Sequence, residues 1–230
     1  MNVTSLCDKG DVRIANEDRL LVKRYTISGE EWSMFLVADG MSGRGGEASQ
    51  TIVDVLSSWW DNDLPTILSL PFEMEMVLSS LDSTIAVANS NVLALHPQNP
   101  IVSTLSLLMV MGKKYAIRHV GDSRIYLIND AICQLTPDHI IETEPMRTVL
   151  AKCIGAKKVV SLFNLVGESK PGDMFLLCTD GMYRQVTDEM ILATVLNCSI
   201  AIEEKANALR NAIPPGKAYD NVSIILVGDM

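Results

Sequence analysis

The 230-residue chain is poor in residues that hold soft metals or form crosslinks, and it has no long apolar run. Its three histidines are isolated, and its five scattered cysteines, which form no Cys-x-x-Cys pair, are Cys7, Cys133, Cys153, Cys178 and Cys198. This pattern favours reduced thiols over a disulfide framework or a zinc site. No apolar run approaches the roughly 20 residues of a membrane span, and the first residues lack the apolar part of a secretory signal. We therefore expect a cytoplasmic protein without a membrane segment.

Positive charge is also scarce. The chain has 19 lysines and arginines against 28 aspartates and glutamates, a formal net charge of −9 at pH 7. A nucleic-acid binder needs a basic surface, so this balance argues against a nucleic-acid partner. The hydrophobic fraction of 48% is sufficient for a large core, and no repeat, low-complexity tract or linker divides the sequence. We expect one domain over residues 1–230.

The spacing of apolar residues predicts strands and helices in separate blocks. The strands are expected at residues 11–28, 31–38, 104–111, 114–120, 124–129, 131–135, 174–178 and 222–227. The helices are expected at 46–60, at 71–95, from about 187 and at 202–212. Because strands and helices do not alternate one by one, the order predicts an α+β fold. We expect a central antiparallel β-sandwich flanked by helices on both outer faces, in four layers (α-β-β-α).

Two apolar runs far apart in the chain end in the same way, in Asp39–Gly40 and in Asp180–Gly181. Each Asp-Gly alone is also an ordinary turn signal. Asp220 stands just before another predicted strand and Asp122 just after one, so all four carboxylates lie at strand ends. If they converge, each pair about 4 Å apart repels by roughly 4 kcal/mol, and bound cations are needed. Ligation by oxygen alone favours Mg²⁺ or Mn²⁺.

A second acidic segment, Asn16–Asp18, follows Arg13 by three residues. In a strand, Glu17 and Asp18 point to opposite faces, so both reach one site only at a bend or with one acting through water. A two-metal carboxylate site suits the hydrolysis of phosphate esters, and a guanidinium suits the phosphate oxygens. Arg13 is placed for that role, although a solvated surface arginine and a surface ion pair at Glu17 are the alternatives.

These segments resemble, in order, the motifs of the metal-dependent protein serine/threonine phosphatases (the type 2C, or PPM, family), in a small bacterial form. The matching segments span nearly the whole chain: Asp11–Asp18, Ala38–Gly43, Gly46–Ser49, Ser103–Thr104, Val120–Arg124, Leu135–His139, Gly172–Asp173 with Thr179–Gly181, and Asp220–Ser223. The resemblance implies a β-sandwich flanked by helices, with metals in a cleft at one edge. It also implies that Asp39 bridges two metal ions, that Gly40 lends its carbonyl to the second ion, and that Asp180 and Asp220 hold the first.

The resemblance assigns four further residues. It implies that Glu17 and Asp18 sit at the second metal ion or its waters, and that Arg13 binds the phosphoryl group. Asp122 resembles the residue that helps to hold a third, weaker metal ion in bacterial members. The cofactors implied are thus two Mn²⁺ or Mg²⁺ ions and a third, weakly bound one.

The sequence departs from the family pattern in two main places. Met41 stands where animal members have a histidine proposed to protonate the leaving group, so we expect a metal-bound water to do so. The flap region around residues 140–155 is short, and Ile140 replaces a common serine there. Ser42 in place of the usual glycine is a milder change.

The resemblance implies an enzyme, an Mg²⁺/Mn²⁺-dependent phosphoprotein phosphatase that acts on phosphoserine and phosphothreonine without a phosphoenzyme. Its partners would be a phosphorylated protein substrate and a counterpart serine/threonine kinase. The short flap leaves an alternative: a catalytically weak regulatory or partner-switching module of the same fold, acting on one dedicated phosphoprotein.

Overall fold

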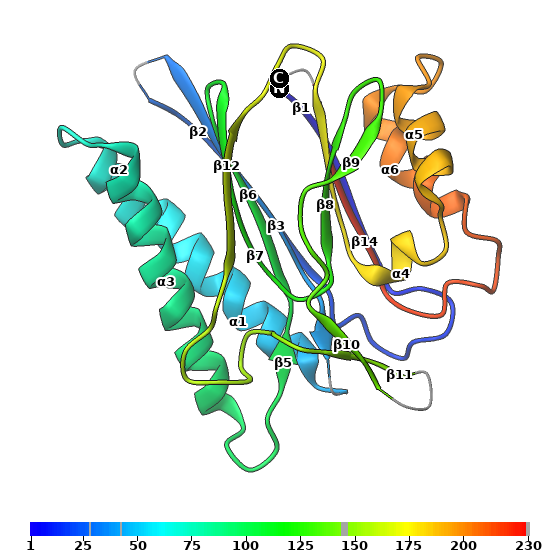
Figure 1. Ribbon diagram of the computed structural model, residues 1–230, viewed down its shortest axis with the longest axis horizontal. Coiled ribbons are helices and arrows are strands. Elements are labelled where there is room, and N and C mark those ends of the chain that lie inside the picture. The colour runs from blue at the N-terminus through cyan, green and yellow to red at the C-terminus, as the bar shows by residue number, and fades with distance from the viewer. Residues whose placement is uncertain (28, 42, 144–146, 229–230) are drawn as a thin grey trace.

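Two antiparallel five-stranded sheets pack face to face in the computed structural model, which describes all residues except 28, 42, 144–146 and 229–230 (Figure 1). The first sheet has the order β1 (Asn2–Asp8), β14 (Val222–Gly228), β13 (Met174–Cys178), β8 (Arg124–Ile128) and β9 (Ile132–Gln134). The second has the order β12 (Phe163–Glu168), β7 (Lys114–Val120), β6 (Leu105–Met111), β3 (Glu30–Ala38) and β2 (Arg19–Ile27).

Helices cover the outer face of each sheet (Figure 1). On the second sheet lie α1 (Gly45–Ser58) and α3 (Met74–Leu95), and α1 continues through a π-helical turn, η1 (Trp59–Asp63), into α2 (Leu64–Leu68). On the first sheet lie α5 (Asp188–Leu196) and α6 (Ile202–Asn211). The predicted α+β sandwich with helices on both outer faces is therefore confirmed.

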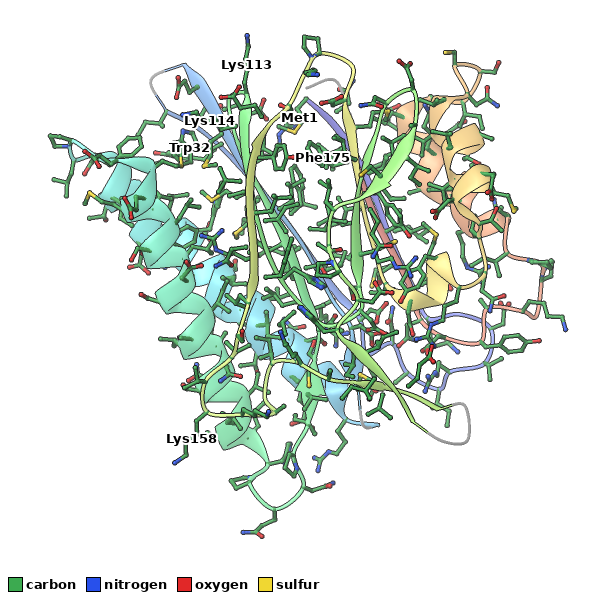
Figure 2. All side chains as sticks on the ribbon, in the orientation of Figure 1. Met1, Trp32, Lys113, Lys114, Lys158 and Phe175 are labelled. Atoms are coloured by element: carbon green, nitrogen blue, oxygen red, sulfur yellow. The ribbon has the colours of Figure 1, made fainter. Side chains whose placement is uncertain are left out.

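The alternation of side chains along a strand fills three apolar layers. In β3, Trp32, Met34 and Leu36 pack against the helices, whereas Phe35 and Val37 lie between the sheets. In β13, Phe175 lies in that same middle layer, while neighbouring residues face α5 and α6. Figure 2 shows Trp32 on the side of α1–α3 and Phe175 between the sheets. Because these strands are buried on both faces, they read in sequence as continuous apolar runs.

The predicted strand at 11–28 is wrong over its first part, because only Arg19–Ile27 forms β2. Residues 9–18 instead form a loop that turns at Gly10, whose φ of 77° suits glycine. The Asp11 N–H donates to the Ala218 carbonyl (2.8 Å), and the Asp11 carboxylate accepts from the Ala218 N–H (3.0 Å). These contacts hold the loop beside the segment before β14, as the blue and red loops in Figure 1 show.

Other elements were missed. Neither β1 nor β12 was predicted, because each is a partly exposed edge strand with few apolar residues. Asp180–Tyr183 forms a short helix, α4, that was also missed. Two small antiparallel pairs complete the fold: β4 (Gly40–Met41) with β5 (Val102–Ser103), and β10 (Ile140–Thr143) with β11 (Arg147–Leu150).

The region of the predicted flap contains the β10–β11 hairpin, while the predicted match at Pro145 and Met146, like Ser42, falls outside the described residues. The single domain and the shortened flap stay predictions. No helix in the described part of the chain is long and apolar enough to cross a membrane.

Candidate metal centre

A cavity of about 570 Å³ opens where loops from both sheets meet. It is lined by six of the residues predicted from the sequence: Arg13, Glu17, Asp39, Gly40, Asp180 and Asp220. The other two predicted residues, Asp18 and Asp122, are buried beside this cavity. Segments separated by more than 200 residues of sequence thus supply one acidic site, as the convergence hypothesis requires.

Asp39 follows β3, and its backbone is fixed by Thr104. The Asp39 N–H donates to the Thr104 hydroxyl (2.9 Å), and the Thr104 N–H donates to the Asp39 carbonyl (2.9 Å). The same hydroxyl is hydrogen-bonded to the hydroxyl of Ser123 (2.7 Å). Thr104 therefore ties Asp39 to the loop that carries Asp122.

Gly40 is required by a close approach of backbones. A Cβ at this position would lie 2.2 Å from the carbonyl oxygen of Gly45 and 2.7 Å from that of Glu17. The Glu17 carbonyl accepts hydrogen bonds from the Gly40 N–H (3.3 Å) and the Ser49 hydroxyl (2.5 Å). The start of α1 and the acidic loop are thereby packed against the end of β3.

Asp220 reaches the cavity beside Arg13. Nη2 of Arg13 and Oδ2 of Asp220 are 2.6 Å apart. This ion pair raises the pKa of Arg13 above its ordinary value. The Asn221 side chain fixes the contact between the two loops. It accepts from the Glu17 N–H (2.9 Å) and donates to the Ala15 carbonyl (3.1 Å).

Glu17 and Asp18 lie at a bend, which is one of the arrangements that the sequence left open. The Asp18 N–H donates to the Asn16 side-chain oxygen (3.0 Å), so the chain turns at Glu17. Glu17 lines the cavity, while Asp18 is buried and accepts a hydrogen bond from the Thr179 hydroxyl (2.9 Å). Burial raises the pKa of Asp18 to about 7, and the nearby Asp180 and Asp220 add to the rise.

Asp180 is the first residue of α4. A Cβ on Gly181 would lie only 2.0 Å from the Asn221 carbonyl oxygen, so α4 packs directly on the segment before β14. One residue missed from the sequence joins the site here: Arg184 Nη2 lies 3.1 Å from Asp180 Oδ2 and 3.3 Å from Asp122 Oδ2. Its spacing of four residues from Asp180 would have indicated this pair had α4 been recognised as helical.

The carboxylates raise one another's pKa. Burial raises the pKa of Asp39 well above its ordinary value, and Asp18, Asp180, Asp122 and Asp220 raise it further. The pKa of Asp122 rises to about 6, first through burial and then through Asp180. Bound cations would offset this repulsion and favour the ionised carboxylates.

These oxygen donors fit a hard divalent ion in chemistry. Within the described ranges, no three His, Cys, Asp or Glu side chains already form a closed metal cage. Asp220 instead pairs with Arg13, and Asp180 pairs with Arg184. The metal-binding roles predicted for the acids therefore remain proposals.

Bacterial phosphatases have this same arrangement of two packed sheets and outer helices. The structure of the serine/threonine phosphatase Stp1 from Staphylococcus aureus superposes with a TM-score of 0.84 at 25% identity, covering 99% of this chain and 94% of that one. The family model for protein phosphatase 2C matches residues 11–213. The chain belongs to the protein phosphatase 2C family, and the resemblance found in the sequence is confirmed.

Two curated relatives illustrate the range of the family. The serine/threonine phosphatase Stp of Listeria innocua is 27% identical over 242 residues, which cover 96% of this chain and 92% of the relative. The serine/threonine protein phosphatase PstP of Mycobacterium tuberculosis is 26% identical over 240 residues. That match covers 95% of this chain but only 43% of PstP, so this chain spans less than half the length of that relative.

Proposed function

We propose that this protein is a phosphoprotein phosphatase that hydrolyses phosphoserine and phosphothreonine by direct attack of water. One observation carries the proposal: Asp39, Asp180 and Asp220 line one cavity together with Arg13. Family membership supports it, because the relatives named above are serine/threonine phosphatases.

The carboxylates are proposed to hold two Mg²⁺ or Mn²⁺ ions. Asp39 would contact both ions, Asp180 and Asp220 would hold the first, and Glu17 and Asp18 would support the second with the Gly40 carbonyl. Two such ions would lower the pKa of a water molecule and offset the negative charge of the phosphoryl group. The bend at Glu17–Asp18 supports this division, because it gives one acid to the cavity and buries the other beneath it.

Arg13 is proposed to bind the phosphoryl group. Its side chain is 53% exposed at the mouth of the cavity, so its guanidinium is free to exchange a carboxylate oxygen for phosphate oxygens. Met41 also lines the cavity and has no proton to donate. The serine or threonine oxygen that leaves must therefore take its proton from water. The exposed Val12 and Ile14 flank Arg13 and would face the residues beside the phosphorylated one.

The alternative, a catalytically weak regulatory or partner-switching module, is not favoured. All the principal acids and Arg13 meet at one site, and the relatives are named as phosphatases. A counterpart serine/threonine kinase stays a prediction.

The test is phosphate release from phosphoserine and phosphothreonine peptides by the purified full chain, with Mn²⁺ and after treatment with EDTA. Release should require Mn²⁺, and Asp39→Asn should lower it by about 100-fold or more, because the charge between the two ions is lost. The matched control is Asp130→Asn, an exposed aspartate at the other end of β8 from Asp122, which should keep full activity. Circular dichroism checks that each variant is folded.

If neither EDTA nor Asp39→Asn lowered phosphate release, the proposed chemistry would be wrong. Tight Mn²⁺ binding, measured by calorimetry, without turnover of any phosphopeptide would instead favour the regulatory module.

A further inference from the structure

One guanidinium, that of Arg184, lies between two acids beside the cavity. Arg184 Nη2 is 3.3 Å from Asp122 Oδ2 and 3.1 Å from Asp180 Oδ2. The two carboxylate side chains are only 8% and 14% exposed, whereas that of Arg184 is 50% exposed. The cation therefore approaches from the solvent side and closes over a nearly buried pair of acids.

The backbone of α4 places Arg184 for this contact. Residues four apart lie on the same face of a helix, so Arg184 stands one turn above Asp180, and its N–H donates to the Asp180 carbonyl (3.0 Å). The preceding residue, Tyr183, donates its hydroxyl proton to the carbonyl of Asp122 (2.9 Å). Two successive side chains of this segment thus hold the Asp122 loop, one through its backbone and one through its carboxylate.

The support extends one layer further. The guanidinium of Arg124 lies 3.7 Å from the centre of the Tyr183 ring, and its own charge is paired with Asp138 at 2.7 Å. Tyr183 is therefore packed between the Asp122 loop and a fixed cation. Arg184 extends from an anchored segment and not from a free loop.

Arg13, the arginine that lines the cavity, is held differently. Arg13 meets a single carboxylate, that of Asp220, and both side chains are open to solvent at 53% and 35% exposure. That pair can separate without leaving a buried charge alone. Removing Arg184 would leave both Asp122 and Asp180 without the cation that they share.

We propose that Arg184 is the resident cation of the Asp122–Asp180 pair, so that this chain binds two divalent ions and takes no third ion at Asp122. The expected count of two ions rests on the proposed function. Arg184 would take the place of the third, weaker ion that the resemblance implies at Asp122. Arg184 is then a positioning residue, since it acts through the two acids and does not touch substrate.

The test counts bound Mn²⁺ on the full chain, by equilibrium dialysis and by the electron paramagnetic resonance signal of free Mn²⁺, up to millimolar concentrations. The unaltered protein should bind two ions. Arg184→Gln, which removes the charge but keeps a polar side chain, should bind a third. Arg184→Lys, which retains a cation, should return the count to two.

A double variant locates the extra ion. Arg184→Gln combined with Asp122→Asn should lose the third ion and keep the first two. Three ions on the unaltered protein, or two on Arg184→Gln, would overturn the inference while leaving the proposed function intact. No Mn²⁺ binding by the unaltered protein would overturn both. A count of three on the unaltered protein overturns the inference without any variant, whereas a count of two leaves the role of Arg184 to be decided by the folded variants.

Discussion

Asp39–Gly40 after β3 and Asp180–Gly181 after β13 share a sequence pattern but continue into different structures. The first continues in extended form as β4, which pairs with β5. The second turns at once into α4. In both places the glycine is packed against a backbone carbonyl, that of Gly45 in one case and of Asn221 in the other. The shared pattern therefore reflects a shared need for close packing behind a site carboxylate.

The two aspartates also differ in their charged neighbours. The influences on Asp39 are burial and four other carboxylates, all of which raise its pKa. Burial raises the pKa of Asp180 as well, but Arg184 on α4 opposes that rise. A helical continuation allows an arginine four residues later to partner its acid, and an extended continuation does not. Asp39 is consequently the acid with the greater need for an added cation.

The largest effect is expected from an added methyl group behind either aspartate. Gly40→Ala and Gly181→Ala should each lower the free energy of unfolding by about 3 kcal/mol or more, because the new Cβ would lie 2.2 Å and 2.0 Å from carbonyl oxygens. Urea unfolding measures the loss. Phosphatase activity should fall with it, since the carboxylates must move.

The matched control for these substitutions is Gly46→Ala. Gly46 lies in α1 next to Gly45, and a Cβ there meets nothing closer than 3.6 Å. Alanine should therefore be neutral or stabilise the helix by up to about 1 kcal/mol. If all three variants unfolded at the same urea concentration, the account of close packing at Gly40 and Gly181 would fail.

The next effect concerns charge, in the protein freed of metal by EDTA. Asp39→Asn should raise the free energy of unfolding by on the order of 2 kcal/mol at neutral pH, because it removes a carboxylate repelled by its neighbours. Asp180→Asn should give less, since it also deprives Arg184 of a partner. Paired urea titrations of the two variants separate these expectations, and an equal gain for both would contradict them.

The same cluster gives the metal-free protein a pH dependence of known sign. An aspartate whose pKa is raised in the folded state contributes most below its unfolded pKa, and that contribution is lost as the pH rises through the folded value. The ordinary value is 3.8 and the folded values are about 6 for Asp122 and about 7 for Asp18, so these two groups should lower stability as the pH rises from about 4 to about 7. Buried His119, with its pKa lowered to about 4, acts in the opposite direction only below its unfolded value of 6.5.

The layers of the fold were predictable from sequence because they follow from simple periodicities. Strands buried on both faces read as nearly continuous apolar runs, as in β3 and β6, and α3 shows apolar residues at helical spacing. The edge strands β1 and β12 carry too little apolar material to stand out. Residues 11–18 were predicted as part of a strand and instead form a loop, because their form depends on hydrogen bonds to residues about 200 positions away.

The acids of the candidate site could be predicted from the sequence, but the residues that contact and position them could not. Asp39, Asp180 and Asp220 were identified because each stands at the end of an apolar strand. The roles of Thr104 and Arg184 were not, because each depends on a contact between separate segments or on an unrecognised helix. A polar residue on a predicted strand or loop gives no local signal of such a contact.

The smallest effects are expected at the two threonines whose hydroxyls support the site, Thr104 beside Asp39 and Thr179 just before α4. Thr104→Val keeps the shape of the side chain but removes the hydroxyl that accepts from the Asp39 N–H and meets Ser123. We expect a loss of about 1 kcal/mol in the free energy of unfolding. Mn²⁺ affinity should weaken by about 10-fold, as is usual when a group that orients a metal ligand is lost.

Thr104→Ser, which keeps the hydroxyl but loses a buried methyl group, should retain the Mn²⁺ affinity of the unaltered protein. Thr179→Val is the counterpart at the other Asp-Gly, where the hydroxyl donates to Asp18 and not to the aspartate that follows it. It should therefore change the pH dependence of the metal-free protein, which depends on Asp18, whereas Thr104→Val should leave that dependence in place. If both valine variants had the same pH profile, the hydroxyls at Asp39–Gly40 and at Asp180–Gly181 would have the same role, and the difference proposed here would be wrong.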